Sequence, residues 1–317
     1  MSARSQDTPD AGPLAQRSRQ VSDGLPEVAA PEPAAPELGA APRADRSSGA
    51  SVARPAPVAS PEFDLPENLR FELEEGRYHV RLARNESEVR AAQRVRFEVF
   101  NRELGEGLDC NTELGLDRDR FDANCHHVIL IEASTGRIVG TYRCQTAAMA
   151  RAGQGFYCDG EYELASLPEE VLERAVETGR ACLLLEHRQG TGLFGLWRGL
   201  AAYLLAHNAR YMFGCCSLTS QNPREGLIAN AWLEKRGKIN TEVQVPVRAS
   251  HRCEGAEPLP SEVAKFKLPK LFGSYMRYGA LACSPPALDR EFGTVDFLVL
   301  FDLERLEQKL YGLFFEF

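Results

Sequence analysis

The sequence predicts an α/β fold in which helices cover both faces of a mixed, twisted sheet. Six or seven short segments have the apolar or alternating pattern of strands, and helical patterns separate most of them. Residues 126–133 and 137–144 are two strands joined by the tight turn Ser134-Thr135-Gly136. The hairpin makes part of the sheet antiparallel, and the interleaved helices favour parallel strands elsewhere.

Residues 1–63 differ from the rest of the chain in composition. Ala, Pro, Ser, Arg and Asp dominate, as in PEVAAPEPAAPELGAAPRA, and no aromatic residue precedes Phe63. Such a segment buries too little apolar area to offset the entropy lost on ordering. We expect a disordered tail over 1–63 and one folded domain over 64–317.

Charge and cysteine content narrow the class of protein. The net charge of −8 excludes a general nucleic-acid footprint, and an acidic carrier partner would need a local basic patch. The nine cysteines form no CxxC pair, which is typical of free thiols in a reducing cytosol. No apolar run approaches the ~18 residues that span a bilayer, and MSARSQDTPDAGP lacks the apolar core of a signal peptide. We therefore expect a cytoplasmic protein whose membrane contact is peripheral at most.

The first strand and helix of the domain carry a notable arginine. Residues 78–84 alternate like a strand, and Asn85 with Glu88 predicts the start of a helix that continues to about Leu104. Arg96 and Phe100 are four residues apart and hence neighbours on that helix. An arginine on a half-apolar face either meets an anion or carboxylate, or extends its charged end to solvent.

A polar connection over residues 105–124 follows, and it is long for a loop without a function. Asp119 and Asp122 could bind a cation or belong to an ordinary surface turn, although the loop lacks the dense acids of a calcium loop. His126 and His127 would point to opposite faces of a strand, which argues against a shared metal. We predict no metal site.

The stretch from Glu177 to Tyr203 has the pattern of strand, glycine turn and helix. Residues 180–186 form a short buried strand with Glu177 and Arg180 at its entry, and Gly190 and Gly192 allow a sharp turn. A helix that begins after such a turn presents free N–H groups and a positive dipole end, which suit a phosphate. The alternative is an ordinary strand–turn–helix without a ligand.

The remaining elements complete the predicted sheet. We expect helices over 168–174, 223–237 and 268–282, strands over 210–218 and 293–302, and an edge strand over 240–247 weakened by Pro246. The tail over 303–317 is partly amphipathic and is expected to dock on the domain rather than on lipid. The GxGxxG, GxxxxGK[ST], GxSxG and HExxH motifs are absent from the sequence.

The order of several short motifs resembles a known family. Arg96-x-x-x-Phe100, Asp119-x-x-Asp122, Arg143 near a strand end and Glu177-x-x-Arg180 resemble the acyl-homoserine-lactone synthases, which share the GNAT acyltransferase fold. A closer similarity is to the L-ornithine Nα-acyltransferases, carried by DRDRFDANCHHVIL, GFYCDGEYEL, ETGRACL and ALDREFGTVDFLVL. The similarity covers roughly residues 78–305. It implies a GNAT-like sheet over the folded domain and an acyltransferase activity.

Three departures from these families matter. RQGTG, residues 188–192, is only a loose counterpart of the GNAT phosphate-binding motif. Gly273 stands where members usually carry a lysine, which weakens the transfer of any role there. The tryptophan that the synthases carry soon after Phe100 is missing, which argues against a homoserine-lactone product.

The resemblance implies amide formation between an amino acid and an acyl thioester of acyl carrier protein. Glu177 would accept the amine proton directly or through water, as a general base. Asp119 and Asp122 would bind the cationic amino acid, and Arg96 or Arg143 would meet its carboxylate in a bidentate pair. Phe100 and Arg180 complete the substrate site.

The carrier side of the predicted site lies in the glycine turn. Arg188 and the N–H groups of Gly190, Gly192 and Leu193 would hold the phosphate of the carrier's phosphopantetheine arm. A backbone N–H along 182–185 would stabilise the oxyanion. The acyl-phosphopantetheine is a co-substrate, so we predict no bound cofactor.

The predicted reaction moves a (3-hydroxy)acyl chain from acyl carrier protein to the α-amine of ornithine and forms lyso-ornithine lipid. Two alternatives remain. One is the same chemistry with glycine, another amino acid or a homoserine-lactone-type acceptor. The other is a non-catalytic GNAT-like domain that binds a lipid or a partner.

Overall fold

The structure, a computed structural model, describes residues 62–108 and 112–317. The predicted tail over 1–63 therefore lies almost wholly outside the described residues. Glu62 forms an isolated bridge with Asn85, and the N–H of Phe63 donates to the carbonyl of Arg84. Among the described residues, Glu62 and Phe63 thus pair with the domain although they precede the predicted boundary at residue 64.

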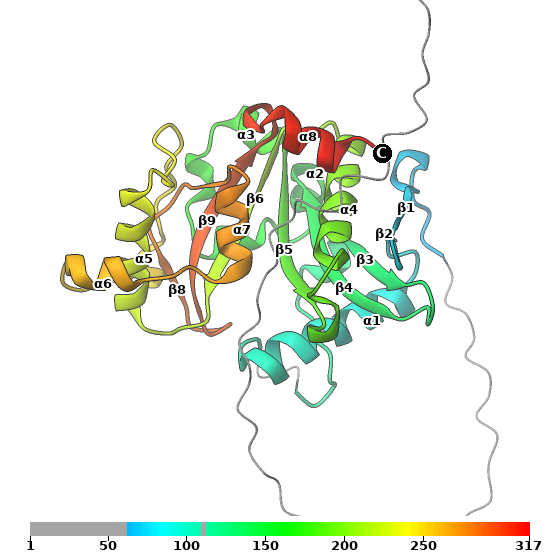
Figure 1. The fold of residues 1–317 in the computed structure, drawn as a ribbon, viewed down its shortest axis with the longest axis horizontal. Helices are drawn as coiled ribbons and strands as arrows, with labels where there is room; N and C mark the ends of the chain where they lie inside the picture. Colours follow the sequence, from blue (N-terminus) through cyan, green and yellow to red (C-terminus); the bar gives the residue numbers. More distant parts are fainter. Residues whose placement is uncertain (1–61, 109–111) are drawn as a thin grey trace, which may run out of the picture. The chain divides into compact units, whose positions relative to one another are not determined.

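One mixed sheet of nine strands organises the described residues (Figure 1). Its order is β1-β2-β3-β4-β5-β6-β9-β7, with β8 paired to β9, and β5–β6 is the parallel pair among antiparallel neighbours. The strands are β1 Glu72–Glu75, β2 Tyr78–Leu82, β3 His126–Glu132, β4 Ile138–Thr146, β5 Ala175–Leu183, β6 Tyr211–Leu218, β7 Leu281–Ala282, β8 Ala287–Asp289 and β9 Thr294–Asp302. The predicted α/β fold with a mixed sheet is confirmed.

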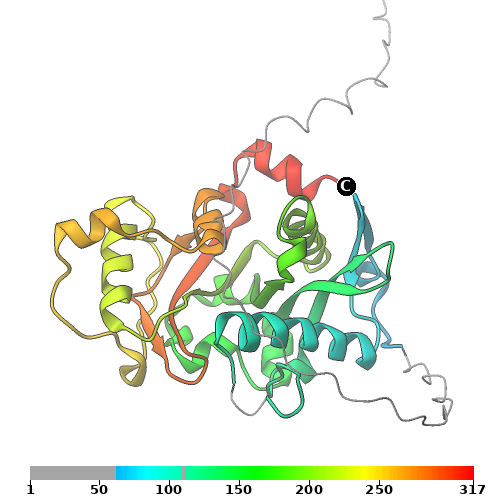
Figure 2. The same cartoon turned by 60° about the horizontal axis from the view of Figure 1, so that its bottom comes forward.

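The helices lie on both faces of this sheet (Figure 2). They are α1 Glu86–Phe97, α2 Ala147–Ala152, α3 Glu169–Glu173, α4 Gly192–Ala206, α5 Pro223–Lys235, α6 Pro260–Lys265, α7 Lys270–Arg277 and α8 Gln308–Phe315. A π-helical segment, η3 Glu98–Leu104, extends α1 as far as the sequence predicts. None of the helices in the described ranges is long and apolar enough to cross a bilayer.

Alternation along β3 explains how the two faces are covered. Val128 and Leu130 join the core cluster that includes Leu196 and Leu200 of α4, whereas Ile129 packs with Ala92 of α1. Successive strand residues point to opposite faces, so α1 and α4 lie on opposite sides of the sheet. The side chains of the candidate site lie on the α1 face.

The C-terminal segment docks on α4, as predicted. The ring of Phe314 in α8 is buried and lies within 5.7 Å of the rings of Phe194, Trp197 and Tyr278, measured between centroids. Tyr278 follows α7, so this aromatic contact joins α4, α7 and α8.

Three sequence expectations differ from the structure. β5 begins at Ala175 rather than at 180, so Glu177 and Arg180 lie within the strand instead of at its entry. Residues 240–247 form no strand. The side-chain oxygen of Asn240 accepts hydrogen bonds from the N–H groups of Glu242 and Val243, which makes a turn. Strand-like pairing in this segment is limited to an isolated bridge at Val247. The short elements β1, β8, α2 and α6 were not predicted. The helix predicted over 268–282 ends at Arg277, and its last two residues form β7 instead.

Candidate active site

The parallel strands β5 and β6 pair over a short distance and then separate. Their register is Ala175 with Tyr211, Val176 with Met212 and Glu177 with Phe213. At the last contact, a Cβ atom added to Gly214 would lie 2.1 Å from the carbonyl oxygen of Thr178, so only glycine fits. Beyond this point the two strands no longer pair, and the candidate site begins here.

Sheet register places the predicted charged residues on one face. His127 is the partner of Arg143 across β3–β4, and Gln145 is the partner of Glu177 across β4–β5. Arg143 and Gln145 are two residues apart and hence point to the same side of the sheet. The structure therefore brings Glu177 and Arg143, which are far apart in sequence, to one face.

Three arginines and three aspartates form a closed ion network on this face. The Arg96 guanidinium contacts Asp117 and Asp122, with Nη1 2.8 Å from Asp122 Oδ1. Arg143 Nη1 lies 2.6 Å from Asp119 Oδ1 and 3.0 Å from Asp122 Oδ1. Arg180 Nη2 lies 3.0 Å from Asp119 Oδ2. The network joins α1, the 105–124 connection, β4 and β5, and its charges balance.

Burial shapes the protonation of this network. Burial alone would raise the pKa of Asp119 and Asp122, but the positive charges of nearby arginines outweigh burial. These arginines are Arg143 and Arg180 beside Asp119, and Arg96 and Arg143 beside Asp122. Both pKa values are held below the usual range. The two carboxylates are therefore ionised, and the positive charges of the arginines already compensate their negative charges.

This pairing bears on the roles predicted for the network. Arg96 is fully buried and directs its guanidinium at two carboxylates, so it presents no free edge to a substrate carboxylate. Asp119 and Asp122 each meet two arginines and offer little negative charge to a cationic amino acid. The geometry fits a rigid scaffold under the site better than direct contact with substrate.

Arg180 occupies a strained position beside the opening of the strands. Its φ of 49° lies in the left-handed region, and the β4–β5 register shifts between Thr141 and Arg143 opposite it. Its guanidinium lies over the rings of Tyr157 and Phe292, 4.9 and 4.3 Å from their centroids. Phe100 packs edge-on against Phe292, so this predicted substrate residue also lies at the site.

Glu177 holds the segment that carries Tyr157. Its Oε2 accepts hydrogen bonds from Gln145 Nε2 at 2.5 Å and from the N–H of Tyr157 at 3.0 Å. Its Oε1 accepts the N–H of Cys158 at 2.8 Å. A carboxylate has about four lone-pair sites, so one acceptor position remains on Oε1. Glu177 is 5% exposed, so bulk solvent hardly reaches its carboxylate.

The predicted phosphate site lies at the start of α4. Thr191 is the N-cap residue but makes no side-chain capping bond, and Gly190 has a φ of 86° with open space around it. The first N–H groups of the helix, at Gly192 and Leu193, are therefore available to an anion. Arg188 differs from the expectation, because its guanidinium is paired with Glu103 and with the carbonyl of Leu183.

A backbone N–H donor lies between Glu177 and the start of α4. The N–H of Leu184 donates to Val139 across β4. Successive N–H groups of a strand point in opposite directions, so that of Leu183 points away from β4, to the side where β6 has separated. Leu183 lies within the predicted oxyanion segment 182–185.

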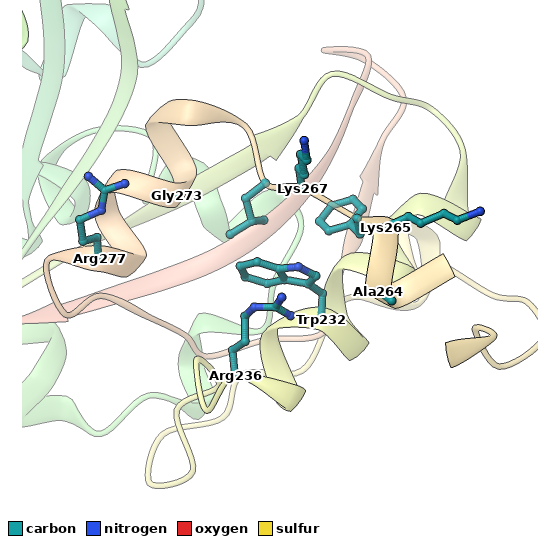
Figure 3. A pocket seen from close by; sticks show the side chains of 9 residues that line it. Trp232, Arg236, Ala264, Lys265, Lys267, Gly273 and Arg277 are labelled. Carbon is teal, nitrogen blue, oxygen red and sulfur yellow. The ribbon is translucent and has the colours of Figure 1, made fainter. Parts of the chain in front are cut away.

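A basic groove lies between α5, α6 and α7 (Figure 3). It encloses about 680 Å³, and its floor is formed by Trp232, with the Arg236 guanidinium 3.8 Å from the ring centroid. Its charged residues are Arg236, Lys265, Lys267 and Arg277, and all four are exposed. Within the described ranges, none of the four is within 4.0 Å of a carboxylate oxygen.

Curated relatives match most of the chain. An L-ornithine N(alpha)-acyltransferase of Rhodobacter capsulatus is 33% identical over 240 residues, which cover 73% of this chain and 92% of the relative. The enzymes of the same name from Brucella abortus and Agrobacterium fabrum are 31% and 33% identical and are covered over 87% and 80% of their lengths. The chain belongs to the L-ornithine N(alpha)-acyltransferase family. It is therefore an acyltransferase, and the non-catalytic alternative is set aside.

The fold of this acyltransferase agrees with a second comparison. Residues 95–198, which contain the ion network, Glu177 and the first half of α4, match the acetyltransferase (GNAT) domain family. The solved structure of a CoA-dependent acyl-homoserine lactone synthase with MTA aligns at a TM-score of 0.42 and 14% identity, over 72% of this chain and 81% of that one.

Sequence reasoning missed two residues of the candidate site. Asp117, 0% exposed, is the third acid of the network, but only Asp119 and Asp122 have the spacing of the family motif. Tyr157 contacts Arg143, Arg180 and Glu177, although its segment has only the pattern of a loop. No pattern in the sequence distinguishes Asp117 from the other acids of the 105–124 connection.

Proposed function

We propose that this acyltransferase moves an acyl chain from the thioester of acyl carrier protein to the α-amine of ornithine, with lyso-ornithine lipid as the product. The family name carries the acceptor, since relatives matched over 80–92% of their lengths bear it. The amine nitrogen forms a bond to the acyl carbon, the carbon–sulfur bond breaks, and the carrier thiol leaves with a proton.

The α-amine is the chemically favoured nucleophile. An α-ammonium has a pKa near ~8 and a side-chain ammonium near ~10.4, so the α-amine is far more often neutral at pH 7. We propose that the free acceptor position on Glu177 Oε1 takes the proton, directly or through one water. The N–H of Leu183 would stabilise the oxyanion, and the N–H groups at the start of α4 would hold the carrier phosphate.

The basic groove supports a carrier protein as the donor. The whole chain is acidic, with a net charge of −8, yet four unpaired cations gather in one groove. Local charge complementarity of this kind steers an acidic partner to one surface. α7 forms one wall of the groove, and Tyr275 and Tyr278 at this helix pack against Trp197 of α4. The groove is therefore connected by packing to the helix whose start is the predicted phosphate site.

Purified protein tests the reaction directly. Incubation with 3-hydroxyacyl carrier protein and single amino acids should release free thiol with ornithine and form the N-acyl product. Release with glycine or homoserine lactone and not with ornithine would change the acceptor. Thiol release without an N-acyl product would mean hydrolysis and would contradict amide formation.

Glu177→Gln tests the proposed base. General base catalysis contributes about 10²–10⁴-fold, so turnover should fall by that factor at neutral pH. Raising the pH should restore part of the rate, because more of the amine is then neutral without help. A folded variant with the wild-type rate would remove Glu177 from the mechanism.

A further inference from the structure

A second set of buried acids lies beside the ion network and has no cations. Glu161, Asp289, Asp296 and Glu106, here called the acidic cluster, are each at most 8% exposed. Within the described ranges no lysine, arginine or histidine forms an ion pair with any of the four. The ion network nearby is also buried, but it pairs three acids with three arginines. The acidic cluster therefore differs from the network in lacking cations and not in how deeply it is buried.

Two oxygens of the cluster are buried and lack a hydrogen bond. They are Oε2 of Glu161 and Oδ1 of Asp296, on side chains that are 4% and 3% exposed. The Tyr162 hydroxyl, close to both carboxylates, also has no hydrogen bond within 3.5 Å. Buried carboxylate oxygens without a partner cost free energy unless a cationic group meets them.

The cluster lies on the same face of the sheet as Glu177. Glu177 is the partner of Phe213, Cys215 lies two residues further along β6, and Ser217 is the partner of Asp296 in β9. Alternation along β6 therefore puts Glu177, Cys215 and Asp296 on one side. Carboxylate oxygens of Glu161 and Asp296 lie within 4.8 Å of each other and of Cys215 Sγ.

Tyr157 joins the cluster to the proposed base. Its N–H donates to Glu177, and its hydroxyl donates to Asp289 Oδ2 at 3.2 Å. The length of one tyrosine therefore separates the proton acceptor from the acidic cluster. An amino acid with an α-amine at one end and a side-chain ammonium at the other could contact both.

We propose that Glu161 and Asp296 bind the side-chain ammonium of the acceptor and select a dibasic amino acid over one with a neutral side chain. The assignment rests on the proposed function, because it takes the acceptor α-amine to lie at Glu177. A side-chain ammonium stays charged near neutral pH and donates three hydrogen bonds, which suit Glu161 Oε2 and Asp296 Oδ1, the two oxygens that have no donor among the described residues.

An ammonium fits the cluster better than a metal ion. The third possible metal ligand, Cys215, has its Sγ 3.5 Å from that of Cys158, and this contact and burial raise the pKa of the Cys215 thiol. A neutral thiol is a poor ligand, because metals bind the thiolate. Asp289 cannot complete a metal site, since its oxygens already accept the N–H groups of Glu291 and Phe292 and the Tyr157 hydroxyl.

Direct binding separates this subsite from turnover. Titration calorimetry would compare L-ornithine with L-norvaline, which has the same carbon chain without the terminal amine. Glu161→Gln and Asp296→Asn keep the side-chain shape and remove the charge. Glu163→Gln, at an exposed position two residues from Glu161, is the matched control.

We expect wild type and Glu163→Gln to bind ornithine and to discriminate against norvaline. Glu161→Gln and Asp296→Asn should weaken ornithine by about 30-fold or more and leave norvaline almost unchanged. Melting curves of the two variants should show no loss of stability, which rules out misfolding as the cause.

Other results overturn the subsite and are distinct from failure of the reaction. Unchanged ornithine binding in both variants removes the subsite even if thiol release occurs. Lost binding in the variants of a protein that releases no thiol keeps the subsite and refutes the acyl transfer. A metal ion present in equal molar amount in the purified protein, and absent from Asp296→Asn, would show that the cluster binds a metal instead.

Discussion

Arg96 is the residue on which the buried charges depend most. It is fully buried and meets both Asp117 and Asp122, so Arg96→Met removes one arginine from each carboxylate and leaves the three aspartates of the network with two arginines, Arg143 and Arg180. Breaking a buried pair on one side costs about 3–5 kcal/mol, and we expect this loss in the free energy of unfolding measured with urea. Arg90→Ala is the control on the same helix, since its exposed pair with Glu86 is worth under about 1 kcal/mol. Equal losses in the two variants would contradict the network.

Removing the charge of either of two aspartates on the same face of the sheet should change the stability of the fold in opposite directions. Arg96 and Arg143 outweigh burial and lower the pKa of Asp122, so its charge stabilises the fold above pH ~3.8 and this contribution is lost as pH falls. Burial, followed by Asp289 and Glu106, raises the pKa of Asp296 from 3.8 to about 6 despite contacts with Ser217 and Thr294. Its ionisation therefore costs stability as pH rises from ~3.8 to about 6, and the cost is full above that pH.

Asp122→Asn should thus destabilise the protein at pH 7.5, whereas Asp296→Asn should stabilise it in the absence of ligand. The gain for Asp296→Asn is at most about 3 kcal/mol, because each pKa unit corresponds to about 1.4 kcal/mol. The effect should vanish below pH ~4, where the wild-type carboxyl is protonated as well. Thermal melts at pH 7.5 and below pH ~4 test this, and an Asp296→Asn variant less stable than wild type at pH 7.5 would contradict it.

At the scale of elements, the separation of β5 from β6 starts at a glycine. Alanine at Gly214 would place a methyl group 2.1 Å from the Thr178 oxygen and force the strands apart. We expect Gly214→Ala to lose at least about 1–3 kcal/mol of stability and most of the activity, because the strand opening shifts. Gly179→Ala, where no atom lies within 4 Å of the added carbon, is the control and should remain folded. Melting curves that agree for the two variants would sink the idea.

The elements themselves could largely be predicted from the sequence. The β3–β4 hairpin, the capped start of α1 at Asn85, and the turn before α4 all arise from local patterns. Residues 240–247 alternate like a strand, but Asn240 caps the backbone and Pro246 lacks an N–H, so local hydrogen bonds prevail over the pattern.

The site was only partly within reach of the sequence. The motif residues Arg96, Arg143, Glu177 and Arg180 share one face, yet their partners could not be assigned from spacing alone. Glu161 and Asp296 come from a loop and a late strand, and only the register of β6 with β9 and the Tyr157 contacts bring them beside Glu177. Non-local pairing of this kind leaves no periodic signal in the sequence.

At the scale of the whole molecule, charge is unevenly distributed, and this predicts where the proposed carrier protein would dock. The double variant Lys265→Glu/Lys267→Glu leaves two cations and two acids in the basic groove, which removes its net positive charge, and should slow association with acyl carrier protein by at least about 10-fold at low salt, with a smaller effect at high salt. Lys309→Glu, exposed on α8, makes one Lys→Glu change elsewhere, half the charge change of the double variant, and should have little effect. Association rates from surface plasmon resonance measure this, and equal rates for both variants would move the docking surface away from the groove.

The stacking of Arg236 on Trp232 also gives the molecule an intrinsic optical reporter. The chain has two tryptophans, and the other, Trp197, packs against the rings of Tyr275, Tyr278 and Phe314, away from the groove lining. Occupation of the groove should change the emission of Trp232 alone, so an unlabelled mixture would report complex formation in real time and Trp232→Phe would silence the signal.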